Sequence, residues 1–137
     1  MEILAAPKTL EKEVAILYVD DEEVNLFLFK KNFEGDYPVF VAHSGVLALE
    51  ILEEQKDKIV VVISDFRMPR MNGIQFINEA RKRHDKIIYF MLTGYGQNQE
   101  ITEALENNII YECFNKPFPM ELLEEKIMEA LQNYWKN

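Results

Sequence analysis

Cysteine is almost absent from this sequence, and long apolar runs are absent altogether. The single cysteine, Cys113, excludes an internal disulfide and makes no metal cluster by itself, which fits a reduced cytosolic setting. The longest strongly apolar run, residues 59–63, falls far short of a membrane span. The N-terminus carries an acid where an export signal would carry bases. We therefore expect a cytoplasmic protein with no membrane segment.

Basic residues are also scarce in comparison with acidic ones. The chain has 15 lysines and arginines against 24 aspartates and glutamates, a formal net charge of −9, and the acids are spread along it. Such a surface repels phosphate backbones and has no general attraction to an acidic membrane. The basic cluster at residues 81–83 is interpreted as a solvated helix face. We expect no direct binding of nucleic acid or membrane by this segment.

The length and composition are those of one compact domain. The 137 residues are 48% hydrophobic and 28% charged, which suits a folded chain with a single core. We find no internal repeat, low-complexity segment or composition break in residues 14–137, which we assign to the domain. Residues 1–13 form an N-terminal lead that is a short helix, a linker or a disordered segment.

The hydrophobic pattern alternates between strands and helices. Five short segments rich in β-branched or aromatic residues predict strands at 15–19, 39–42, 59–64, 87–92 and 110–114. Between and after them, apolar residues recur at helical spacing and predict buried helix faces: Ala48, Ile51 and Leu52; Ile101, Ala104 and Leu105; Leu123, Ile127, Ala130, Leu131 and Tyr134. Right-handed crossovers then produce a doubly wound α/β domain, with a parallel five-stranded sheet and helices on both faces.

Polar side chains follow four of the predicted strands at their carboxyl ends. Asp20 and Asp21 follow the first strand, Asp65 the third, Thr93 the fourth and Lys116 the fifth. In open α/β sheets ligands lie beyond these ends, so we expect the five side chains to converge. Three carboxylates held together stay ionised only beside a cation, and oxygen ligands suit Mg²⁺. Lys116 would pair with a phosphate oxygen, and Asp65 would act as a nucleophile that forms an acyl phosphate.

Each part of this pattern also has a plainer interpretation. An Asp-Asp pair after a strand is more often a helix cap, and Thr93-Gly94 is usually a loop start. Lys116-Pro117 alone would be a turn with a solvated lysine. The functional interpretation therefore depends on the joint occurrence of these residues in this order.

The combined motifs resemble the response-regulator receiver family of two-component signalling. The resemblance covers roughly residues 14–135 and rests on Ile16-Leu17-Tyr18-Val19-Asp20-Asp21-Glu22, on Ser64-Asp65-Phe66-Arg67-Met68-Pro69 with Gly73, on Leu92-Thr93-Gly94 and on Asn115-Lys116-Pro117-Phe118. It implies a flavodoxin-like sheet of order 2-1-3-4-5.

The resemblance also assigns the acceptor and the metal ligands. It implies that Asp65 is the phosphoacceptor and that Asp21 and Asp65 bind Mg²⁺. Asp20 is expected to help through water, and the backbone carbonyl of Arg67 to complete the protein's ligands. Thr93 matches the family's switch hydroxyl, which turns inward to bond the phosphoryl group.

Lys116 matches the phosphate-pairing lysine of the family, and its bond to Pro117 is expected to be cis. One position departs from the family pattern. Receivers usually have an aromatic residue three positions before the lysine, where this chain has Cys113. Tyr111 lies two residues earlier, and we expect it on the same strand face as Cys113. Both are candidate switch residues, and Cys113 is interpreted as a small, half-buried strand residue without a redox role.

The family also implies the partners. The phosphodonor would be a sensor histidine kinase or a phosphotransfer protein, and an output domain or downstream protein would read the shape change. The domain would be a monomer or a phosphorylation-dependent homodimer. Its only catalysis would be of its own phosphorylation and dephosphorylation.

Three alternatives stay open. A phosphatase with an aspartate nucleophile would use similar metal chemistry but place an Asp-x-Asp pattern at the first strand. An FMN binder of the same sheet order would need a Ser/Thr/Gly-rich phosphate loop, where this chain has Asp21-Glu22-Glu23. A degenerate receiver would keep the fold only as a docking module.

Overall fold

The computed structural model describes residues 14–94, 96–117 and 119–136, with residues 134–136 placed by their backbone alone. The predicted lead at residues 1–13 and the side chain of Tyr134 lie outside the described part of the chain.

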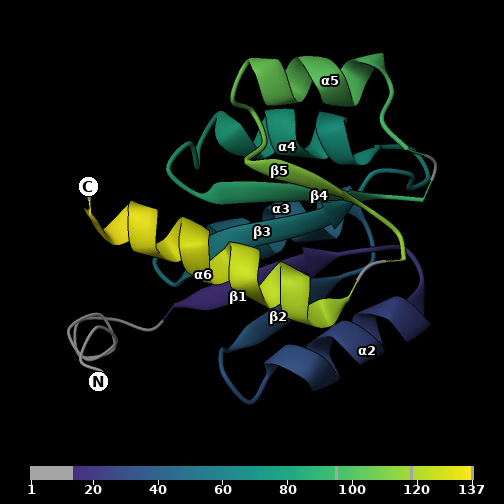
Figure 1. The fold of residues 1–137 in the computed structure, drawn as a ribbon. Coiled ribbons are helices and arrows are strands. Elements are labelled where there is room, and N and C mark those ends of the chain that lie inside the picture. The colour runs from purple at the N-terminus through teal and green to yellow at the C-terminus, as the bar shows by residue number, and fades with distance from the viewer. Residues whose placement is uncertain (1–13, 95, 118, 137) are drawn as a thin grey trace.

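A parallel five-stranded sheet forms the centre of the molecule (Figure 1). The strand order is β2-β1-β3-β4-β5, as predicted, with β1 at Ala15–Val19, β2 at Val39–Ala42, β3 at Ile59–Asp65, β4 at Ile88–Thr93 and β5 at Glu112–Asn115. Every residue of β1 and β3 is buried. These strands form the middle of the sheet, where both faces are covered, and this explains their uninterrupted apolar runs.

Helices cover both faces of the sheet: α2 (Glu23–Phe33), α3 (Gly45–Glu54), α4 (Gly73–Arg81), α5 (Gln99–Glu106) and α6 (Met120–Lys136). The buried residues of α2 and α6 pack in one cluster on one face, and those of α3, α4 and α5 pack in a second cluster on the other (Figure 1). The predicted helical stripes face these two cores. Within the described residues, no helix is both long and apolar enough to cross a membrane.

Side-chain caps begin three of the helices. Ser44 accepts a hydrogen bond from the backbone of Leu47 at the start of α3, and Asn98 accepts one from Ile101 at the start of α5. Asn72 begins α4 with a reciprocal capping box to Gln75. Because each of these helices follows a strand, the caps lie at the carboxyl edge of the sheet.

Gly73 allows α4 to begin directly against the end of β3. Its backbone N–H donates to the carbonyl of Phe66 at 2.7 Å. A Cβ at this position would collide with the carbonyl oxygen of Asp65, so any larger residue would push α4 away from the strand. Glycine here keeps the loop after Asp65 tight.

The predicted and observed strand bounds agree for β1 and β2 and differ for the other three. β3 extends to include Asp65, and β4 extends to include Thr93. The fifth strand begins at Glu112 and not at residue 110. The reason is that the backbone N–H groups of Ile109 and Ile110 donate to the carbonyl of Ala104, which closes the end of α5 before the strand begins.

Candidate functional site

A cavity of about 560 Å³ opens at the carboxyl edge of the sheet. Its lining combines acidic, basic and apolar residues: Asp21, Glu22, Asp65, Arg67, Met68, Pro69, Gly94 and Lys116. The residues come from the ends of β1, β3, β4 and β5, as the strand-end argument predicted.

Three carboxylates meet at this edge. Asp20 and Asp21 follow β1 and Asp65 ends the neighbouring strand β3, so the parallel pairing of these strands brings them together. One oxygen from each of the three carboxylates lies within 4.8 Å of the others. Asp20 is completely buried, Asp65 is nearly so and Asp21 is exposed at the mouth. The structure therefore brings the predicted acidic residues into one cluster.

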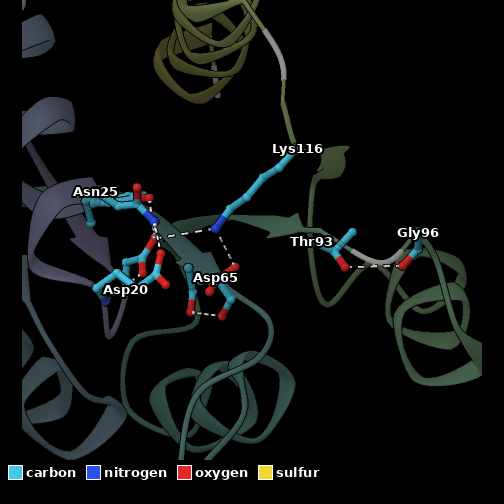
Figure 2. A network of polar contacts seen from close by, with 9 residues as sticks. Asp20, Asn25, Asp65, Thr93, Gly96 and Lys116 are labelled. Carbon is cyan, nitrogen blue, oxygen red and sulfur yellow. Dashed lines mark hydrogen bonds and ion pairs between the residues drawn. The ribbon is translucent and has the colours of Figure 1, made fainter.

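Lys116 reaches the cluster from beyond the far edge strand (Figure 2). Its Nζ lies 3.0 Å from Oδ1 of Asp65 and 3.5 Å from Oδ2 of Asp20. The Lys116–Pro117 peptide bond is cis, as predicted. The ammonium group is thus shared between two carboxylates and lies closer to the predicted phosphoacceptor.

The electrostatics leave the cluster with excess negative charge. Burial raises the pKa of Asp65 above its ordinary value, Lys116 opposes this rise, and the charges of Asp20 and Asp21 add to it. Burial by itself lowers the pKa of Lys116, but its hydrogen bond and ion pairs with Asp65 and Asp20 outweigh burial and raise that pKa. Three carboxylates facing one ammonium, with oxygen as the only donor atom, fit a hard divalent cation such as Mg²⁺.

Asp20 is held by donors that the sequence analysis did not identify. The hydroxyl of Tyr18 donates to Oδ2 at 2.7 Å, and the amide of Asn25 donates to the same oxygen at 3.1 Å (Figure 2 labels Asn25). Burial, then the charge and the hydrogen bond of Asp20, raise the pKa of Tyr18 well above its ordinary value. The sequence placed Tyr18 two residues before Asp20 at the end of the first strand, but spacing did not show which atoms would bond.

Thr93 ends β4 with its side chain almost completely buried. Its hydroxyl donates to the carbonyl of Gly96 at 3.2 Å, and Figure 2 shows it turned toward Gly96 and away from Asp65. The inward orientation expected of a switch hydroxyl is therefore not the one in this structure. Arg67 lines the cavity two residues beyond Asp65.

The expectation that Tyr111 and Cys113 share a strand face is wrong. The Tyr111 ring packs edge-on against Phe90 at 5.4 Å, and its hydroxyl donates to Glu129 of α6 at 2.9 Å. Cys113 packs against the core on the other face, under α3, α4 and α5. Tyr111 precedes the first residue of β5, so the alternation of side chains along the strand does not apply to it.

Cys113 itself has the predicted half-buried environment. Burial, with a smaller effect of the Glu112 charge, raises the pKa of its thiol to about 11. The thiol is therefore protonated at neutral pH, which agrees with a packing residue and not a reactive one.

The sequence matches the family model described as response regulator receiver domain over residues 16–128. It is 32% identical over 123 residues to a chemotaxis protein CheY homolog of Campylobacter jejuni, a match that covers 85% of this chain and 91% of that protein. It is 25% identical over 122 residues to the hydrogenase transcriptional regulatory protein HoxA of Cupriavidus necator, which covers 89% of this chain. The chain spans about 25% of that regulator's length.

Solved structures agree with these matches. A response regulator receiver domain protein from Clostridium thermocellum superposes with a TM-score of 0.79 at 28% identity. The superposition covers 88% of this chain and 95% of that one.

Proposed function

Because the chain belongs to the response regulator receiver domain family, and is thus a switch of two-component signalling, we propose that Asp65 is the residue that carries its phosphoryl group. The observation that carries this proposal is the pairing of a nearly buried Asp65 with Lys116 at 3.0 Å, beside Asp20 and Asp21. Asp65 also lines the open cavity, so a donor can reach it.

The proposed step is a phosphoryl transfer. A carboxylate oxygen of Asp65 bonds to the phosphorus while the bond between phosphorus and the donor's leaving atom breaks. From a phosphohistidine, the electron pair of the broken P–N bond stays on the imidazole nitrogen, which takes up a proton. The products are an acyl phosphate on Asp65 and a free histidine, with Lys116 paired to a phosphate oxygen.

The acidic cluster supports a cation in this step. Asp21 and Asp65 would hold Mg²⁺ through their carboxylates and Arg67 through its backbone carbonyl, while Asp20 would act through water. The bound cation would supply positive charge to the oxygens of the transferring group. The chain's own charged partner of Asp65 and Asp20 is the ammonium of Lys116.

The proposed response begins at Thr93. Its hydroxyl would leave the carbonyl of Gly96 and bond the phosphoryl group, which favours one arrangement of the loop before α5. A part for Cys113 and Tyr111 in the switch remains a prediction. They would act through different contacts, Cys113 through the core under α5 and Tyr111 through Glu129 of α6.

The proposed partners follow from the relatives. A sensor histidine kinase or phosphotransfer protein would supply the phosphoryl group. An output domain, as the longer transcriptional regulators suggest, or a separate downstream protein, as the CheY homolog suggests, would read the change. The domain would act as a monomer or as a phosphorylation-dependent homodimer.

Acetyl phosphate with Mg²⁺ tests the proposal without a kinase. Mass spectrometry should detect one added phosphoryl group on the wild type and on Asp57→Asn, an exposed carboxylate outside the cavity. The group should be missing from Asp65→Asn. Labelling of Asp65→Asn would contradict the acceptor, no labelling of the wild type would indicate a docking module, and rapid repeated turnover would indicate a phosphatase.

A further inference from the structure

The carboxylate of Asp20 is completely buried and surrounded by donors. Its Oδ1 accepts from the backbone N–H of Glu22 at 3.0 Å. Its Oδ2 accepts from the hydroxyl of Tyr18 at 2.7 Å and the amide of Asn25 at 3.1 Å, and it forms an ion pair with Lys116 at 3.5 Å. The shortest of these contacts is the one from Tyr18, a neutral donor beneath the site.

The Tyr18 ring is held firmly in place. It stacks on Phe29 of α2 with a centroid distance of 4.2 Å and an interplanar angle of 4°, and Phe29 stacks on Phe33. Tyr18 is itself buried on β1. The stacking therefore fixes the position of the hydroxyl beside Asp20 and ties α2 to the acidic cluster.

Removal of this hydroxyl would change the charges above it. The buried Oδ2 of Asp20 would lose its shortest hydrogen bond and keep only the longer contacts from Asn25 at 3.1 Å and Lys116 at 3.5 Å, and weaker satisfaction of a buried acceptor is costly. The nearest charged donor is Lys116, which now lies closer to Asp65, at 3.0 Å against 3.5 Å. Lys116 would be drawn toward Asp20, and the Asp20 carboxylate would turn with it.

We propose that Tyr18 is a positioning residue of the phosphorylation site, whose hydroxyl holds Asp20 in place and keeps Lys116 beside Asp65. The inference rests on the proposed function, because it gives Asp20 a part in binding Mg²⁺. Groups that orient metal ligands affect affinity although they do not touch the metal. Tyr18 acts in this way from below the sheet edge, while Asn25 acts on the same oxygen from α2.

A Mg²⁺ titration followed by ¹⁵N amide shifts tests the inference on the whole chain. Tyr18→Phe keeps the ring that stacks on Phe29 and removes only the hydroxyl. Its affinity for Mg²⁺ should fall by about tenfold, the low end of the losses seen for partners of metal ligands. The matched control is Tyr37→Phe, whose hydroxyl contacts Met128 of α6 and not the site. Its affinity should equal that of the wild type.

A second variant, at Asn25, tests whether the hydrogen bonds to Oδ2 of Asp20 are what matters for Mg²⁺ affinity. Asn25→Ala removes the other neutral donor to Oδ2, and the double variant should lose less affinity than the product of the single losses, because both act on one oxygen. Equal affinities of Tyr18→Phe and wild type would overturn the inference and leave the proposed function standing. An equal loss in Tyr37→Phe would also overturn it. A wild type that binds no Mg²⁺ would overturn both.

Discussion

Charged groups gather at both ends of the sheet, but the two sets differ in their balance of charge. At the carboxyl end, the carboxylates of Asp20, Asp21 and Asp65 lie together, and the ammonium of Lys116 pairs with two of them, Asp65 and Asp20. We call these four residues the carboxyl-end cluster. At the opposite end, one carboxylate has two partners. Glu53 at the end of α3 meets Arg83 at 2.9 Å and the imidazole of His84 at 3.0 Å; these three residues form the amino-end cluster.

The difference separates a structural role from a functional one. In the amino-end cluster Arg83 is a partner of opposite charge for Glu53, and the cluster joins the end of α3 to the chain after α4. His84 also accepts a hydrogen bond on its carbonyl from Tyr89 of β4. In the carboxyl-end cluster three carboxylates lie beside one lysine, an arrangement that suits a divalent cation.

The largest expected difference between the clusters is in Mg²⁺ affinity. Asp21→Ala removes an exposed carboxylate of the proposed site and should weaken Mg²⁺ binding about a hundredfold or more, above the loss typical of groups that only orient ligands. Glu53→Ala should leave the affinity unchanged. Isothermal titration calorimetry measures both. Similar losses in the two variants would remove the functional distinction between the clusters.

Lys116→Ala should separate metal binding from the response within the carboxyl-end cluster. The lysine is not a metal ligand, so Mg²⁺ should still bind, while the amide shifts of Thr93 and Gly94 on treatment with acetyl phosphate should largely disappear. Lys126→Ala is the control, because this lysine pairs only loosely with Glu112 and Glu129 on the surface. A Lys116→Ala variant that responds fully would contradict the assigned role.

The stability of the apoprotein should depend on pH through Asp65. The pKa of Asp65 in the folded chain is raised, chiefly by burial, so ionisation of this carboxyl lowers the stability of the fold. The contribution of Asp65 to stability is therefore fully present below the pKa of the unfolded chain and is lost as pH rises through the pKa of the folded chain. In the absence of Mg²⁺, Asp65→Asn should therefore be more stable than the wild type at neutral pH. Below about pH 4, the ordinary pKa of a free aspartate, the difference should vanish. Urea unfolding in EDTA measures the difference in stability between the two proteins. If Asp65→Asn were less stable than the wild type at neutral pH, the prediction would be wrong.

The amino-end cluster should respond in the opposite direction and by less. Glu53→Gln removes a partly exposed ion pair, so it should lower the free energy of unfolding by less than about 1 kcal/mol. High salt should shrink the loss because it screens the pair in the wild type. Thermal melts at two salt concentrations measure it. A gain in stability of Glu53→Gln would show that loss of a carboxylate has the same effect on stability in both clusters, against the prediction.

The sequence predicted the fold and the residues of the carboxyl-end cluster from general properties of parallel sheets. Apolar runs predicted the buried strands, and the strand ends marked Asp65, Thr93 and Lys116 because parallel strands end at one edge. The predicted bounds differed for β3, β4 and β5, and the error in side-chain direction came at the fifth strand. Alternation of side chains predicted a shared face for Tyr111 and Cys113, but the backbone of Ile109 and Ile110 is bonded to the end of α5 and β5 begins only at Glu112, after Tyr111.

What the sequence by itself determined is which residues follow the carboxyl ends of the strands, because periodicity predicts the alternation of strands and helices, and right-handed crossovers then predict a parallel sheet. The strand order was implied by the resemblance to the receiver family. The tertiary structure alone decided which donor bonds which oxygen. The stacking on Phe29 directs the hydroxyl of Tyr18 at Asp20, and the reach of Lys116 across the sheet end sets its distances to Asp65 and Asp20. These depend on side-chain directions and helix positions set by packing between distant segments, and residue spacing carries no information about either.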